Sequence, residues 1–250
     1  MKRRLLAWLG ACLPLAPCGG RAATVGAPLR YEGGRTLVGF EIESVESPVD
    51  DETLRSVRYL GRVSTRIGDS WIASLRLGGS EIDVASAVHG RATSFEGRPK
   101  LALGAAAGWL RPLRLEGAEL FADASALYTL SSGWTDFTTV IQSNTFHEEY
   151  ENRYRCIEYQ AAAGLRTRLP FGAAHAGGLV RAVDGAVWRE TYQAGALVSS
   201  SSDDFSLGMR LYALGGVDFR LPGRMLLAVS GSARSSDDFA WTVSIAEVSR

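Results

Sequence analysis

Charged side chains recur on the polar face of alternating segments along this chain, and they are its main candidates for chemistry. Eight arginines and six acids share this placement, so the two signs nearly balance. Because buried charges need partners of opposite sign, the pattern predicts an ion-pair network that fills a lumen. The alternative is a narrow channel with a slight preference for anions, since rings of one charge sign select ions. The residues expected to line the lumen are Glu41, Glu43, Arg58, Arg62, Arg66, Arg76, Glu119, Asp123, Glu158, Arg166, Arg168, Arg210, Asp218 and Arg220.

Histidine-based catalysis has little support in the sequence. His89 and His147 lie in segments expected to be long loops, and His175 follows a short turn. Hydrolysis needs a base beside a nucleophile or a pair of acids, so His147 with Asp136 or Asp204 is one hypothesis. No metal-ligand spacing, phosphate loop or dinucleotide fingerprint occurs. We therefore expect no catalytic residues and no cofactor.

Acidic residues gather in the segments expected to be loops, while arginines gather near the short turns. The solubility of exposed loops explains this sorting. A further hypothesis is that the loop carboxylates bind divalent cations, which would bridge them to anionic lipid head groups. The weak candidates for such a metal site are Glu148, Glu149, Asp203 and Asp204. The other acidic loop residues are Glu46, Asp50, Asp51, Glu52, Glu151, Asp237 and Asp238.

The pentapeptide Ser-Ser-Asp-Asp-Phe occurs at residues 201–205 and again at 235–239, and each copy opens a run of alternating residues. After the first copy, Phe205, Leu207 and Met209 share a face with the odd-numbered positions as far as Leu221. A period of two is typical of a β-strand, and this run is longer than most strands of soluble proteins. An acidic loop, an aromatic residue and then an apolar face suit a strand that enters a bilayer.

Ten segments show such alternation, although eight or twelve strands are possible. Short turns rich in Pro and Gly connect them at one end, and longer polar segments at 80–97, 131–155 and 190–204 connect them at the other. Because every backbone polar group in lipid must be paired, the sheet has to close. The sequence predicts an all-β fold, a closed antiparallel up-and-down transmembrane β-barrel. The expected strands are 35–45, 56–67, 70–79, 99–110, 116–130, 156–169, 174–189, 205–221, 224–234 and 239–248.

Several aromatic residues fall near the ends of the expected strands. Aromatic rings with one polar edge collect at the boundary between lipid and water. We therefore predict an aromatic girdle. Its members are Tyr59, Trp71, Trp109, Tyr128, Trp188, Phe205 and Trp241.

The N-terminal residues 1–22 have the basic, apolar and small-residue regions of a signal peptide, which leaves 23–250 as a single domain. Lipid attachment at Cys18 is an alternative, although Pro17 disfavours it. Cleavage would remove four basic residues and leave 23 basic against 27 acidic ones, which argues against a nucleic-acid partner. Cys156 would then be the single cysteine, so no intramolecular disulfide is expected. No later segment is apolar for long enough to span a membrane as a helix.

The alternation and the unequal connections resemble those of the small outer-membrane β-barrel proteins of Gram-negative-type bacteria, over roughly residues 35–250. The resemblance implies location in the bacterial outer membrane after export by a cleaved signal peptide. It also implies contact with outer-membrane lipid and the barrel-assembly machinery. One departure is the C-terminus: such barrels usually end on an aromatic residue, and this chain ends Glu247-Val248-Ser249-Arg250.

These observations favour an outer-membrane β-barrel with a structural or surface role, or a narrow, porin-like channel, and they do not favour an enzyme. One alternative is an outer-membrane hydrolase, either an omptin-like protease or a lipid-modifying enzyme. Another is a secreted soluble ligand-binding barrel, which would need an apolar interior and a polar exterior. A requirement for detergent would separate the soluble alternative from the other two.

Overall fold

The computed structural model describes residues 36–49, 52–88, 91–95, 97–141 and 144–249, which form strands and short turns. The expected signal peptide at 1–22 and His89 lie outside the described residues. The side chains of 135–148, and therefore those of His147 and Glu148, are outside them too. The described part contains no helix long and apolar enough to cross a membrane.

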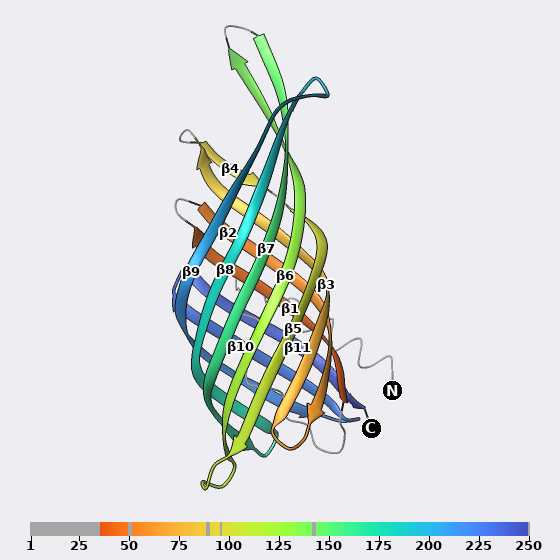
Figure 1. The fold of residues 1–250 in the computed structure, drawn as a ribbon, viewed down its shortest axis with the longest axis vertical. Helices are drawn as coiled ribbons and strands as arrows, with labels where there is room; N and C mark the ends of the chain where they lie inside the picture. Colours follow the sequence, from red (N-terminus) through yellow and green to blue (C-terminus); the bar gives the residue numbers. More distant parts are fainter. Residues whose placement is uncertain (1–35, 50–51, 89–90, 96, 142–143, 250) are drawn as a thin grey trace.

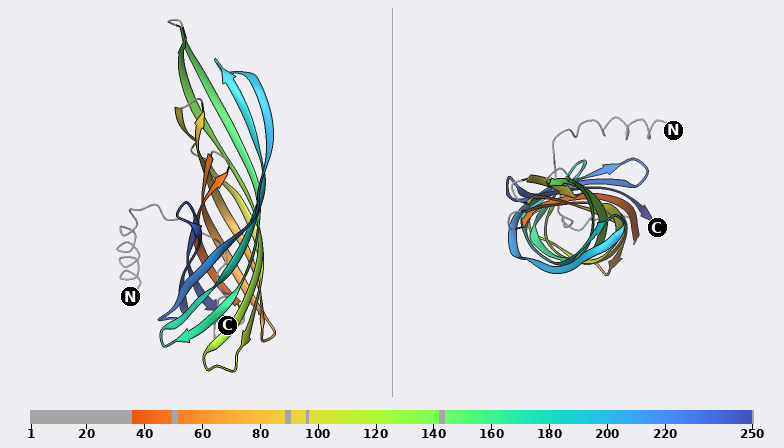
Figure 2. Two further views of the ribbon diagram at one scale, coloured as in Figure 1. Left: turned by 90° about the vertical axis from the view of Figure 1, so that its left-hand side faces the viewer. Right: turned by 90° about the horizontal axis from the view of Figure 1, so that it is seen from above.

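Ten antiparallel strands form a closed, hydrogen-bonded ring, so the predicted up-and-down barrel is confirmed (Figures 1 and 2). Each strand pairs with the next, and the first pairs with the last from Thr36↔Ser249 to Glu46↔Phe239. A short additional strand, β4 (Arg91–Phe95), pairs only with the end of β3. The ring strands are β1 (Thr36–Val49), β2 (Glu52–Ile67), β3 (Trp71–Val88), β5 (Arg98–Pro112), β6 (Ala118–Ile141), β7 (Asn144–Leu169), β8 (Gly172–Gln193), β9 (Ala196–Leu221), β10 (Met225–Ser235) and β11 (Asp238–Ser249).

The outer wall of the ring is apolar. Leu75 is 65% exposed and Leu211 is 67% exposed, while the charged residues that alternate with such side chains point inward and are buried. Apolar patches this extensive are uncommon on soluble monomers and suit a wall that faces hydrocarbon. Other large apolar side chains exposed on this wall are Val38, Phe40, Val63, Leu77, Leu101, Leu103, Leu120, Tyr159, Leu165 and Val229.

The long polar segments differ from the sequence-based expectation, because most of their residues are strand and not loop. β6 continues as far as Ile141, and β7 begins already at Asn144. β8 and β9 are joined by a tight turn. In that turn Ala194 and Gly195 both have positive φ, as the commonest two-residue hairpin turn requires. We define the outer extension as residues 133–141, 144–155, 186–193 and 196–205, which rise beyond the other strands (Figure 1).

A β-bulge corrects the expected register of β9. Arg181 of β8 pairs with Arg210, but Val183 pairs with Leu207, so Gly208 and Met209 together oppose one residue. An extra residue reverses which side chains face inward. Leu207 is therefore buried inside, and Phe205 packs against the same interior cluster, whereas the sequence placed both on the outer face.

The barrel interior also contains apolar layers that the sequence did not predict. The largest cluster contains side chains from seven strands. It surrounds Leu179 and Phe121, which are almost completely buried. A second cluster around Val183 and Tyr154 lies toward the outer extension. The interior therefore alternates charged and apolar layers.

Candidate functional site

The central layer of the lumen is an ion-pair cluster contributed by opposite walls. Arg58 of β2 lies 2.5 Å from Glu158 of β7 and 3.4 Å from Glu43 of β1. β2 and β7 are separated by three strands on one side of the ring and five on the other. Arg181 of β8 adds a contact of 3.0 Å to Glu158 and donates a hydrogen bond of 2.9 Å across the lumen to Ser47. These contacts tie both walls together.

A second layer surrounds Glu41. Arg62 lies 2.6 Å from one carboxylate oxygen of Glu41, and Arg76 lies 3.1 Å from the other. Asp123, which is also buried, interacts electrostatically with both arginines. Alternation turns these four side chains to the inner face of β1, β2, β3 and β6, with β5 lying between β3 and β6.

A third layer lies near the short turns. Arg166 of β7 bridges Glu119 of β6 at 3.0 Å and Asp218 of β9 at 2.9 Å. Arg168 reaches Glu119 from the rim at 3.2 Å. His175 is buried nearby, edge-on to Phe121, and neither of its ring nitrogens has a hydrogen-bond partner among the described residues. This layer lies at the end of the lumen opposite the extension.

Asp238 organises the layer nearest the outer extension, although the sequence placed it in an exposed acidic loop. It is almost fully buried and accepts hydrogen bonds from Ser47 at 3.2 Å and Tyr212 at 2.9 Å. Arg210 and Arg234 contact its other oxygen. The second pentapeptide copy spans the tight turn between β10 and β11, and β11 begins at Asp238, whose side chain points inward.

Most of the predicted lumen residues enter these layers, but three lie at the rim. Arg66 is half-buried and pairs with Asp69 beside the turn, and Arg168 and Arg220 are exposed at the strand ends. Arg181 was missing from the prediction because β8 alternates least regularly. Its pairing with Arg210 on the neighbouring strand becomes visible only in the structure.

The residues of the expected aromatic girdle lie in several different parts of the structure. Trp71 pairs with Trp109 beside the short turns, and Tyr59 is exposed on the outer wall. Tyr128 and Trp241 are half-buried, while Trp188 lies in the outer extension. Phe205 instead faces the interior, because of the bulge in β9. The stacked pair Phe171 and Phe219, with ring centroids 5.7 Å apart near the short turns, was missed.

The carboxylates of the outer extension form surface pairs. Arg153 lies 2.8 Å from Glu151 and 3.3 Å from Glu190, and these hydrogen bonds and charges raise the pKa of Arg153. Tyr192 donates a hydrogen bond of 2.9 Å to Glu190, which raises the pKa of Tyr192. Asp203 lies 3.4 Å from Arg189.

The candidate metal residues do not converge where they are described. Glu149, Asp203 and Asp204 are exposed on the extension, and the side chain of Glu148 lies outside the description. Among the described residues, no group of three or more His, Cys, Asp or Glu side chains is placed to hold a metal ion. Cys156 is buried in the upper interior cluster with Tyr154.

No model of a known protein family matches the chain, and no relative is found among curated proteins. The structure is similar to outer membrane protease OmpT from Escherichia coli (TM-score 0.46, 10% identity, covering 85% of this chain and 92% of that chain). It is also similar to the translocator domain of the autotransporter NalP from Neisseria meningitidis (TM-score 0.49, 10% identity, covering 87% and 88%). The transport unit of the autotransporter AIDA-I from Escherichia coli gives a TM-score of 0.42 at 8% identity, covering 90% and 93%.

The similarity to these three proteins is one of fold at low sequence identity, and it does not define the class of this chain. The class is defined by this chain's own geometry: a closed ring of ten strands, an apolar outer wall and a lumen filled with ion pairs. Such a wall belongs in lipid, where closure of the ring pairs the two edge strands that an open sheet would leave free.

Proposed function

We propose that this chain is a closed, non-conducting barrel of the bacterial outer membrane that holds the outer extension at the cell surface. The contact that supports this role best is the one between Arg58 and Glu158, because it joins opposite walls at 2.5 Å in the middle of the lumen. The role is structural: the barrel anchors the chain in the membrane and presents the outer extension at the cell surface. Residues 1–22 would direct export, and the barrel-assembly machinery would insert the mature chain.

Two features argue against the narrow channel. Every charged layer carries both signs, so no ring of one sign is left to select ions. The apolar cluster around Leu179 and Phe121 adds a layer that water would have to cross without hydrogen-bonding partners.

Single-channel recording in planar bilayers tests the proposal. We expect the wild-type protein to give no resolved conductance steps. The Arg58→Ala, Glu158→Ala double variant removes the shortest ion pair between the walls and should produce leak currents if it folds. Steady, anion-selective steps from the wild-type protein would instead establish the channel. Folding of both proteins is checked by their migration in heated and unheated gel samples, so that absence of current cannot arise from unfolded protein.

Location is tested separately. Fractionation of the producing cells should recover the chain with outer-membrane lipid, shortened at its N-terminus by the signal peptide. Recovery in a soluble fraction would support the soluble ligand-binding alternative instead. Added protease should cut the outer extension on intact cells if it faces outward.

A further inference from the structure

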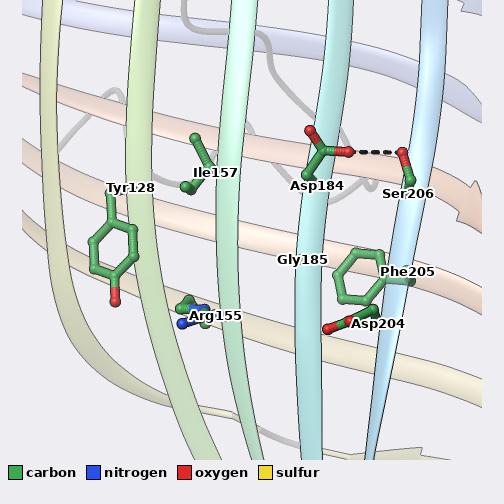
Figure 3. Close-up of a pocket in the computed structure, with 8 residues that line it drawn as sticks. All are labelled: Tyr128, Arg155, Ile157, Asp184, Gly185, Asp204, Phe205 and Ser206. Atoms are coloured by element: carbon green, nitrogen blue, oxygen red, sulfur yellow. Dashed lines mark hydrogen bonds between the residues drawn. The ribbon is translucent and has the colours of Figure 1, made fainter.

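A cavity of about 490 Å³ lies on the barrel wall at the base of the outer extension (Figure 3). Its volume falls in the range of sites that bind small molecules. Gly185 and Phe205 contribute to its lining, and the ring of Phe205 occupies the space where a side chain at Gly185 would project. The other lining residues are Tyr128, Arg155, Ile157, Asp184, Asp204 and Ser206.

The charged side chains of this cavity form no ion pairs with the described residues. Arg155 packs its guanidinium over the ring of Trp188 at 5.1 Å and makes no ion pair within the described part of the chain. Asp204 likewise has no ion-pair partner there, while Asp184 accepts a hydrogen bond of 2.7 Å from Ser206. The cavity thus presents one positive and two negative side chains toward a ligand.

The positive and negative sides face each other across one strand. Arg155 of β7 and Asp204 of β9 both pair with Ala186 of β8, one from each side. With strands about 4.8 Å apart, their backbones lie about 10 Å apart, and no ion pair joins these two side chains among the described residues. A group that carries a phosphate and an ammonium would span this gap and pair with both ends.

The wall on the ring side of the cavity suits a hydrocarbon chain. Below Asp184, the outward residues of β8 are Ala182, Val180, Gly178 and Ala176, which are small or short. Larger exposed side chains flank this strip, Tyr159 on β7 and Leu211 on β9, each paired with one of its members. A ligand held by its head group in the cavity would therefore lay its acyl chain along β8 within the membrane.

We propose that this cavity binds the head group of a membrane phospholipid with a primary ammonium, such as phosphatidylethanolamine. The phosphate pairs with Arg155, and the ammonium donates hydrogen bonds to Asp184 and Asp204. The inference goes beyond the anchoring role and depends only on the chain lying in a membrane, so a conducting barrel would leave it intact. The excess of carboxylates disfavours lipids whose head group carries only negative charge, and the need for N–H donors disfavours a trimethylammonium head.

Native mass spectrometry of the full chain tests this site. The protein is extracted from vesicles that contain equal amounts of phosphatidylethanolamine, phosphatidylcholine and phosphatidylglycerol, and the retained lipids are counted. We expect phosphatidylethanolamine to exceed each of the others by about fivefold, the effect of roughly one partly exposed ion pair. Equal retention of the three lipids, or preference for phosphatidylglycerol, would overturn the proposal.

Variants assign the effect to this cavity. The Asp184→Asn, Asp204→Asn double variant should lose the preference, and Arg155→Gln should lower retention of all three phospholipids. Asp237→Asn is the matched control, since Asp237 is an exposed aspartate in the β10–β11 turn. If the double variant keeps the wild-type preference, or Asp237→Asn loses it, the assignment to this site is wrong. Soluble phosphoethanolamine added in excess should not displace the lipid, because it lacks the chain that lies along β8.

Discussion

The ring and the outer extension share four strands, yet these strands satisfy opposite requirements in the two regions. Within the ring, β7 exposes Leu165 outward and buries Glu158 and Arg166 inward. Within the extension, β9 from Ala196 to Asp204 is exposed on both faces. The backbone pairing continues without interruption from one region to the other, apart from the bulges in β9. Strand pairing therefore does not depend on a buried face, whereas the choice of side chains depends on the surrounding solvent.

The largest difference between the regions should appear when one partner of an ion pair is removed. Arg58→Ala leaves Glu158 and Glu43 buried without that arginine, which costs about 3–5 kcal/mol of unfolding free energy. Urea unfolding of protein in lipid vesicles measures the loss. Arg153→Ala in the extension is the control and should cost no more than about 1 kcal/mol, since its ion pairs are exposed. Equal losses would contradict the contrast between the regions.

A charge placed on the outer wall should give the next largest effect. Leu211→Arg exchanges a lipid-facing side chain for a cation, and the cost should reach about 2–4 kcal/mol if Leu211 lies near the middle of the bilayer. Leu197→Arg makes the same exchange at an exposed position of the extension and should change the unfolding free energy by less than about 0.5 kcal/mol. Unfolding in vesicles compares the pair. If both substitutions are tolerated equally, the ring does not face lipid.

The boundary between the regions can be probed at Gly185. A methyl group there would lie 2.3 Å from Cζ of Phe205, so Gly185→Ala should force that ring to shift and cost about 1–3 kcal/mol. Thermal unfolding in detergent measures the change. The Gly208→Ala variant controls for backbone effects of removing a glycine, because a side chain there meets no neighbour and the φ of Gly208 is not positive. Phe205→Leu should restore part of the lost stability of Gly185→Ala, and failure to do so would mean that the ring is not the obstacle.

The smallest expected effect is electrostatic and belongs to the extension. The hydrogen bond to Glu190 raises the pKa of Tyr192, so the bond stabilises the protein below the ordinary tyrosine pKa and is lost as pH rises through the raised value. Ultraviolet titration of Tyr192, identified by difference from Tyr192→Phe, should give a higher midpoint in wild type than in Glu190→Gln. An equal midpoint in both proteins would show that the hydrogen bond does not form in solution.

Alternation made the ring predictable, because burial on one face and lipid on the other impose a period of two on residue type. That period identified the ten strands and placed side chains such as Glu158 and Arg166 on a common face. The interior assignment of Asp238 could not be predicted in the same way, since its position depends on a turn two residues long and on partners from β1 and β9. Contacts across a ring depend on curvature, which no single strand encodes.

The extension was missed for the opposite reason. Both faces of β9 are exposed around residues such as Ser199 and Asp203, so apolar and polar residue types do not alternate there. Only pairing with β8 makes this segment a strand. The bulge at Gly208 and Met209 was missed because the residue types on either side of it keep alternating while the geometry shifts. Both errors occur where neighbouring strands, and not local sequence, determine conformation.

The asymmetric lengths of β9 and β10 have one more consequence. β10 pairs with β9 only as far as Ala213, so on the side away from β8 no strand among the described residues continues the sheet along β9 from Ala196 to Tyr212. Unpaired backbone groups along a strand edge can pair with strands of other molecules, which leads to aggregation. Four consecutive serines followed by two aspartates occupy much of that strand edge. The hydration of these side chains, and the repulsion between aspartates of neighbouring molecules, would prevent edge-to-edge pairing.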